Sequence, residues 1–436
     1  MIATIPTLLS PEPTLALATA ASEQDCIRGR VREQYERYPY PPASTLGERL
    51  VVAFGAMDYV QHVLWPSRPD LRGLRVLDAG CGTGNTAVRI AHRYPELDIV
   101  GIDLSEASLE TARAHAARLE VGANLTLRRL AIEDVRALGG RFDYIVASGV
   151  LHHLPDPDAG LRALAEVLAP TGGMGIMLYA THGRHGVYMV QDLLRRMAAD
   201  APLDTRVALA RKLLGDWPDG HPFRPGVWSD LGWDGDAGLV DLLLHVQDRS
   251  YTVPEVLACL RSAGLRLEQF YDPTLYNPAA YVNDSDVVRT LAALPTGEQA
   301  AAAELLHGGI WKHMLFATHA TYEPIRVQPE GLAVLALRPK RSPLFDWDRV
   351  ELHDDEQGPR LVVRQYAFDA TVRSVELSPW QARVVEQCDG SRDALAIIEH
   401  PEVYASIPGE SADEKLHAYG RFLEHMAAQT ALLFAM

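Results

Sequence analysis

Cysteine is scarce in this sequence, and the cysteines present form no recognisable binding pattern. Four of them stand at positions 26, 81, 259 and 388 of a 436-residue chain, so no two have the short spacing of a zinc knuckle. Isolated cysteines are typical of small buried apolar side chains in a reducing compartment. We therefore expect no metal ion and a cytoplasmic location.

Basic charge is also in deficit. The chain has 41 lysines and arginines against 57 aspartates and glutamates, which gives a formal net charge of −16. Proteins that bind nucleic acid draw much of their affinity from clustered Lys and Arg side chains. DNA and RNA are therefore disfavoured as substrates or partners.

Long apolar segments are missing too. No apolar run reaches the roughly 18 residues that a membrane-spanning helix needs. The first twenty residues contain three prolines but lack the basic start of a secretory signal. We expect a soluble protein with no membrane partner, whose first twenty residues form a mobile leader.

The length of the chain predicts two or three folded units, and 47% hydrophobic residues supply a sizeable core. Prolines stop a charged helix just after Tyr38, and a second proline-containing connector begins at Pro339. We predict three parts from these signals. They are a leader with an aromatic helix or lid at 1–48, a main domain at 49–322 with insertions at about 181–249 and 275–310, and a C-terminal accessory domain at 323–436.

Strand and helix patterns alternate through the main domain. The predicted strands are 75–78, 98–103, 125–129, 144–147, 175–179, 265–271 and 314–319, and the predicted helices are 23–36, 85–93, 105–119, 159–168, 188–199 and 253–263. Such alternation implies a doubly wound parallel sheet, and therefore an α/β fold. Ser105 has the position and chemistry of a helix N-cap.

The C-terminal part has a different pattern, which predicts a small α+β domain. A strand at 360–366 is followed by a helix with Ser378 as N-cap and Pro379 at its first position, and another helix begins near Arg392. This order is faintly similar to winged-helix modules, including small peptide-binding ones. A regulatory or dimerising cap explains it equally well.

The most informative segment runs from Val76 to Asn85 and reads VLDAGCGTGN. An apolar strand ends in a carboxylate, Asp78, turns through glycines and opens a helix, and the next strand ends in a second carboxylate, Asp103. A carboxylate at that place is suited to ribose hydroxyls. The Gly-x-Gly-x-Gly spacing differs from that of dinucleotide sites and of phosphate-binding loops, and so disfavours a pyrophosphate ligand.

This stretch resembles motif I and the acidic loop of the class I S-adenosylmethionine-dependent methyltransferases. The resemblance continues through 142–155 and 168–173. It implies a Rossmann-like seven-stranded sheet with an antiparallel last strand at 314–319. It also implies S-adenosylmethionine as cofactor, S-adenosylhomocysteine as product, and no metal.

The resemblance also implies roles for individual residues. Asp78, Gly80 and Gly82 would hold the methionine end of the cofactor, Asp103 the ribose, and Leu104 one face of adenine. Asn85 and Ser148 are further predicted cofactor contacts. Related enzymes place an acid after the third strand, where this chain has Ala131; Ile132 is a suitable adenine neighbour, and either Glu133 or Asp134 substitutes for the acid or the backbone alone reads the base.

Two histidines, His152 and His153, follow the fourth strand at the sheet edge where ligands bind in such folds. A histidine near neutral pH can accept a proton from an amine or hydroxyl, or it can hold the substrate. We name both as catalytic candidates and expect positioning to be the more common role of this motif.

Tyrosines surround the proline segment after the first helix. Tyr35 and Tyr38 could close over the cofactor, because a sulfonium is attracted to aromatic ring faces. Other aromatic and charged residues suit a substrate lid, with ordinary packing as the alternative. These predicted substrate contacts are Tyr40, Tyr179, Arg184, Tyr188, Trp233, Asp241 and His245.

The sequence thus predicts a methyltransferase that acts on a small polar metabolite or natural-product intermediate. One alternative is a peptide or protein methyltransferase with the C-terminal domain as its docking module. Another is an inactive binding or regulatory protein of the same fold. A long exposed groove would favour a peptide substrate, and an enclosed pocket a small molecule. A homodimer is compatible with the sequence.

Overall fold

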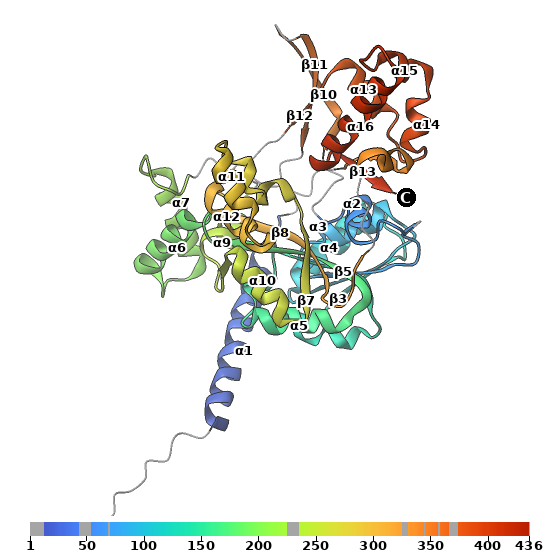
Figure 1. Cartoon of the computed structure of the whole chain (residues 1–436). Coiled ribbons are helices and arrows are strands. Elements are labelled where there is room, and N and C mark those ends of the chain that lie inside the picture. Colours follow the sequence, from blue (N-terminus) through green and yellow to red (C-terminus); the bar gives the residue numbers. More distant parts are fainter. Residues whose placement is uncertain are drawn as a thin grey trace, which may run out of the picture.

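The computed structural model describes residues 13–42, 54–68, 70–224, 235–324, 330–343, 345–355, 358–365 and 374–435. Its elements form a mixed sheet with flanking helices, two helical insertions and a C-terminal unit (Figure 1). Trp233 and the stretch 1–12 of the predicted leader lie outside the described residues. Residues 13–20 of the predicted leader belong to a helix.

The central sheet has the strand order β3-β2-β1-β4-β5-β8-β7, with β6 paired to β5 beside this path. Its strands are β1 (Arg75–Ala79), β2 (Asp98–Asp103), β3 (Leu125–Arg129), β4 (Phe142–Ser148), β5 (Leu168–Ala180), β6 (Ser250–Tyr251), β7 (Leu265–Phe270) and β8 (Lys312–His319). β1 to β6 pair in parallel, whereas β8 is antiparallel to both β5 and β7. The predicted doubly wound sheet with a late antiparallel strand is confirmed.

Both faces of the sheet are buried, because neighbouring residues along a strand enter different cores. Val76 and Tyr144 belong to one hydrophobic cluster, and Leu77 and Ile145 to the other. This double burial explains the nearly continuous apolar runs of the strands. The first cluster includes residues of α2 (Met57–Leu64), α3 (Asn85–Arg93) and α4 (Glu106–Arg118), and the second includes residues of α5 (Pro157–Val167), α10 (Val253–Ser262) and α12 (Thr296–His307).

Two insertions follow β5 and β7; the elements of the second begin at Pro273, two residues before the predicted start near 275. The first contains α6 (His185–Ala198), α7 (Leu203–Gly215) and α9 (Asp236–Leu243), which share a separate hydrophobic cluster. The second contains the short helices η4 (Pro273–Tyr276) and η5 (Pro278–Ala280), then α11 (Ser285–Ala292) and α12. The first insertion therefore has a core of its own beside the sheet.

The C-terminal unit contains both strands and helices, as predicted. Its elements are η6 (Gly331–Ala336), β9 (Arg338–Arg341), β10 (Phe345–Asp355), β11 (Gly358–Gln365), β12 (Ser374–Leu377), α13 (Pro379–Glu386), α14 (Ala394–Ile398), α15 (Pro401–Ser406), α16 (Ala412–Ala428) and β13 (Leu432–Ala435). Ser378 is the N-cap of α13, and Pro379 is its first residue, as expected. Lys340 donates to the Asp58 carboxylate of α2 at 2.8 Å, so this unit packs against the main domain.

Helix α1 (Pro13–Arg37) projects from the body of the molecule, and its C-terminal end lies against the sheet domain (Figure 1). The Glu36 carboxylate accepts hydrogen bonds from the backbone amides of Glu106 and Ala107, at 2.9 and 3.1 Å. These amides begin α4, whose N-cap is Ser105, as predicted. A carboxylate there is favourable because the first amides of a helix lack intrahelical partners and carry the positive end of its dipole.

None of the helices in the described part of the chain is long and apolar enough to cross a membrane. All four cysteines are free thiols.

Candidate functional site

The glycine loop after β1 requires glycine at several positions. Gly80, Gly82 and Gly84 all have positive φ angles, of 74°, 51° and 82°, a region that residues with a Cβ seldom adopt. A Cβ on Gly82 would lie 2.5 Å from the carbonyl oxygen of Tyr40. The loop can therefore turn sharply into α3 while the segment after α1 lies directly on it.

Two buried carboxylates flank this loop. Asp78 at the end of β1 accepts a hydrogen bond from the amide of Ala87 at 2.9 Å. Asp103 at the end of β2 accepts from the amides of Gly82 and Ser105, both at 2.9 Å. Burial raises the pKa of Asp78 to about 7, and the nearby Asp103 charge adds to the rise; burial likewise raises the pKa of Asp103. These carboxylates are held in fixed positions, and no cationic side chain of the described residues forms an ion pair with them.

A cavity of about 380 Å³ extends from the glycine loop to the end of β5. Thirteen of the predicted site residues line it: Tyr35, Tyr40, Asp78, Gly80, Gly82, Asn85, Asp103, Leu104, Ile132, Ser148, His153, Tyr179 and Asp241. Among the described residues that line it, three carry a carboxyl group and one, Lys312, carries an amine. The cavity is thus predominantly acidic.

The segment after β3 supplies apolar contacts rather than an acid. Ile132, which begins the short helix η2 (Ile132–Leu138), lines the cavity together with Leu130. Glu133 instead pairs with Arg28 of α1 at 3.1 Å, and Asp134 is exposed. The structure brings neither acid to the cavity, so of the three options predicted here it favours reading by the backbone and apolar neighbours.

The tyrosines at the C-terminal end of α1 and just beyond it lie in two different places. Tyr35 and Tyr40 line the cavity. The hydroxyl of Tyr38 donates to Asp204 of α7 at 2.7 Å, outside the cavity. The prediction that Tyr38 covers the cofactor therefore needs correction, because this side chain joins α1 to the first insertion instead.

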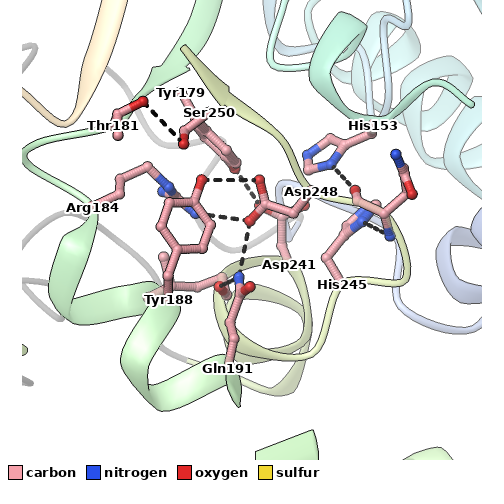
Figure 2. A network of polar contacts seen from close by, with 12 residues as sticks. His153, Tyr179, Thr181, Arg184, Tyr188, Gln191, Asp241, His245, Asp248 and Ser250 are labelled. Atoms are coloured by element: carbon pink, nitrogen blue, oxygen red, sulfur yellow. Dashed lines mark hydrogen bonds and ion pairs between the residues drawn. The ribbon is translucent and has the colours of Figure 1, made fainter. Parts of the chain in front are cut away.

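His153, the last residue of the short helix η3 (Leu151–His153), lines the cavity, and its Nε2 is a buried nitrogen without a hydrogen-bond partner. Its Nδ1 lies 2.7 Å from the carbonyl oxygen of Gln247 (Figure 2). Because a carbonyl can only accept, Nδ1 carries the hydrogen, and Nε2 is left with a lone pair in the neutral ring. His153 is therefore held in the tautomer that a proton acceptor needs.

His245 is held in the opposite tautomer by the same neighbour. The backbone amide of Gln247 donates to His245 Nδ1 at 3.0 Å, so its hydrogen lies on Nε2, 3.1 Å from the Tyr35 hydroxyl. Tyr35 in turn donates to Asp241 at 2.8 Å. Burial lowers the pKa of His245 well below its usual value, which keeps the ring neutral. His245 does not line the cavity; it orients Tyr35, which does.

His152 lies behind the cavity wall. It is fully buried, its ring centroid is 3.8 Å from that of Tyr179, and burial lowers its pKa well below the usual value. A buried ring that does not reach the cavity cannot accept a proton from a substrate there. The structure thus favours packing for His152, in contrast to its naming as a catalytic candidate.

Arg184 and Tyr188 are also placed differently from the prediction. Fully buried Arg184 pairs with Asp248 at 3.4 Å, and Tyr188 and Gln191 donate to the same carboxylate (Figure 2). Neither predicted residue lines the cavity. Their network instead holds the turn that carries Gln247. Because Gln247 is hydrogen-bonded to His153 and His245, the network helps to orient these two rings.

One group of described residues has the spacing of a metal site. His153, Asp241 and His245 each offer a ligand atom, and these atoms lie within 4.8 Å of one another. A metal ligand must present a lone pair, but His245 Nδ1 already accepts from Gln247 and its Nε2 carries hydrogen. The hydrogen bonds therefore favour a proton-handling cluster over a metal centre.

Trp311 and Lys312 are among the cavity-wall residues that sequence reasoning missed. They precede or begin β8, and the Lys312 ammonium lies 4.4 Å from the Trp311 ring centroid. No local motif marks them, because they reach the site only through the antiparallel pairing of β8 with β5.

Comparisons with known proteins agree with this geometry. Residues 77–174 match the model of a family described as a methyltransferase domain. The ubiquinone biosynthesis O-methyltransferase of Neisseria meningitidis serogroup C is 40% identical over 117 residues, which are 27% of this chain and 46% of that protein. The chain therefore matches less than half the length of that relative.

Two other proteins are similar over most of the chain. An uncharacterized protein of Synechococcus is 29% identical over 396 residues, which cover 87% of this chain and 89% of that one. The structure of PKMT2 from Rickettsia typhi in complex with AdoHcy aligns with a TM-score of 0.64 at 17% identity, and covers 91% of this chain and 77% of that one. The fold is therefore shared nearly end to end, C-terminal unit included.

Proposed function

Since the chain belongs to the class I S-adenosylmethionine-dependent methyltransferases, we propose that it transfers a methyl group by direct displacement to a small polar metabolite or natural-product intermediate. The observation that carries this proposal is the single cavity that joins the glycine loop and Asp103 to His153 and Asp241. A cofactor end and an acceptor end are thereby continuous, as an in-line displacement requires.

The residues present fit the cofactor. Asp103 would accept hydrogen bonds from the ribose hydroxyls, since its carboxylate is already oriented by Gly82 and Ser105. Asp78 and the loop amides would hold the methionine end, where a carboxylate attracts the ammonium group. Leu104 and Ile132 would lie against adenine. Bound there, S-adenosylmethionine supplies an electrophilic methyl group on a positively charged sulfur.

The protein's own part in the reaction is to orient the acceptor, exclude water and remove a proton. Tyr35 from α1 and Tyr40 beyond it close one wall of the cavity. His153 lines the cavity and its Nε2 has no hydrogen-bond partner, so it would accept the proton of the acceptor. A catalytic base at this position contributes about 10²- to 10⁴-fold to the rate.

The size of the cavity favours a small molecule. About 380 Å³ lies at the low end of the range for ligand sites, and α1 borders it. The match to the ubiquinone biosynthesis enzyme covers only 27% of this chain, so the acceptor is inferred from the cavity and not from that relative.

Calorimetric titration with S-adenosylhomocysteine tests the cofactor half of the proposal, with one site per chain as the expected result. Transfer of a labelled methyl group from S-adenosylmethionine to a fractionated small-molecule extract tests the other half. Absence of binding in a folded protein would contradict the proposed function. Label that appears only in macromolecules would favour the peptide alternative.

A further inference from the structure

The acceptor end of the cavity, defined here as Tyr35, His153, Tyr179 and Asp241, presents hydrogen-bond acceptors rather than donors. Tyr35 and Tyr179 both donate their hydroxyl hydrogens to the Asp241 carboxylate, at 2.8 and 3.3 Å. His153 donates its ring hydrogen to the carbonyl of Gln247. Three polar hydrogens are therefore used within the wall itself.

Lone pairs remain for a ligand. Asp241 has carboxylate lone pairs left after two hydrogen bonds, Tyr179 can accept through its oxygen, and His153 Nε2 has no partner. A ligand at this place must bring hydrogen-bond donors. A hydroxyl group brings one donor hydrogen, whereas a primary ammonium group brings three. An ammonium group can therefore donate one hydrogen to each of these three side chains.

The negative charge of Asp241 in this wall also favours an ammonium ligand. Asp241 is 6% exposed, and among the described residues it has no ion pair with Lys or Arg; Arg184 pairs with Asp248 and acts on Asp241 only through its charge. A buried carboxylate without a cationic partner is costly. A cationic ligand would offset that cost.

The cofactor is itself a cation, so the position of Asp241 matters. The carboxylates that suit the cofactor, Asp78 and Asp103, stand at the ends of β1 and β2, whereas Asp241 binds Tyr179 at the end of β5. β2 and β5 are three strand spacings apart, or about 14 Å at roughly 4.8 Å per spacing. Asp241 thus lies at the far side of the cavity from the ribose site.

We propose that the acceptor end binds a primary ammonium group beside Asp241, so that the methyl acceptor is an amine nitrogen. The rings of Tyr35 and Tyr40 in the same wall would add cation–π attraction. Tyr179 would bind the ammonium group through its hydroxyl oxygen and not through its ring face, because His152 and Arg184 both lie against that ring. This inference rests on the proposed function and narrows its substrate class.

The transfer step balances with groups already present. The ammonium gives one proton to His153 Nε2, and the freed nitrogen lone pair forms the new N–C bond. The S–C bond breaks, and its electron pair stays on sulfur to give neutral S-adenosylhomocysteine. The product leaves as a methylated ammonium, and His153 returns its proton to solvent.

The test uses the full chain saturated with S-adenosylhomocysteine and three probes followed by ligand-observed NMR. These are n-propylamine, propan-1-ol and Nα-acetyl-lysine amide. We expect both amines to bind and the alcohol not to bind. With S-adenosylmethionine, mass spectrometry should then find N-methylpropylamine if a free amine suffices, or methylated acetyl-lysine amide if a lysine side chain is preferred.

Two variants separate the acceptor from the cofactor. Asp241→Asn should weaken amine binding at least ten-fold and leave the affinity for S-adenosylhomocysteine unchanged. Asp192→Asn removes an equal charge from an exposed position on α6 of the same insertion and should change neither.

Three results would overturn the inference. Propan-1-ol could bind as tightly as propylamine in the unaltered protein, a comparison that does not depend on any variant. Asp241→Asn could bind the amine normally. The same variant could lose affinity for S-adenosylmethionine but not for S-adenosylhomocysteine, which would assign Asp241 to the sulfonium. Failure of the unaltered protein to bind S-adenosylhomocysteine would instead contradict the proposed function.

Discussion

Cofactor affinity should depend on pH through Asp78. This carboxyl group is 3% exposed, it accepts a hydrogen bond from the Ala87 amide, and burial raises its pKa to about 7. The usual value for aspartate is near 3.9. Burial therefore holds the proton on Asp78 across a range where most aspartates are charged.

The direction in which the cofactor affinity changes with pH follows from which protonation state of Asp78 binds the cofactor. Only the carboxylate attracts the ammonium of the cofactor, so binding below pH 7 must first displace the Asp78 proton. Relative to its plateau above pH 8, the affinity should fall about ten-fold at pH 6 and about a hundred-fold at pH 5. Near pH 6, binding should release close to one proton per site.

Isothermal titration calorimetry in two buffers of different ionisation enthalpy measures both quantities. Asp78→Asn should bind more weakly at pH 8 and lose the dependence between pH 6 and 8. Asp98→Asn, at the opposite end of the neighbouring strand and exposed, is the matched control and should titrate like the unaltered protein. An affinity that stays flat from pH 5 to 8, or an Asp78→Asn variant that keeps the full slope, would refute the reasoning.

Four further outcomes are expected. Asp103→Ala should weaken S-adenosylhomocysteine binding by roughly 1.5 to 3 kcal/mol, since it removes charge-assisted hydrogen bonds; undiminished binding by calorimetry would remove Asp103 from the site. His153→Gln should lower kcat by about 10²- to 10⁴-fold and flatten the pH profile at unchanged cofactor affinity, whereas a loss confined to KM would show that His153 only positions the substrate. Arg184→Met should destabilise the fold by about 3 to 5 kcal/mol in urea titrations, because Asp248 is left buried and unpaired; Arg184→Met/Asp248→Asn should recover part of that loss. Deletion of residues 1–42 should leave a folded core that binds S-adenosylhomocysteine at least about ten-fold more weakly, the equivalent of one hydrogen bond, and full affinity after deletion would show that α1 is only a surface helix.

The cofactor end was readable from the sequence because its residues are close together in the chain. The glycine loop, Asp78 and Asp103 span fewer than thirty positions, and the strand–turn–helix geometry that joins them is local. The same holds for the N-cap at Ser105 and for the alternation that predicted the sheet. Short-range backbone preferences and buried-strand patterns suffice for such features.

The acceptor end was only partly readable, because its members come from distant segments. Tyr35 meets Asp241 across 206 positions, and His153 meets Gln247 across 94. The sequence offered both histidines equally; both rings are buried, and only the tertiary structure shows that His153 lines the cavity while His152 does not.

The sequence by itself determined the fold class, the cofactor loop and the acidic composition of this chain, since these depend on local pattern and on counts. Tertiary structure decided which side chains share the cavity and which stand behind it. Arg184 looks like a substrate contact in the sequence, yet Asp248, 64 positions away, draws it into a buried pair. The hydrogen-bond polarity of a site depends on where each proton is already used, and that is fixed only once distant partners have been brought together.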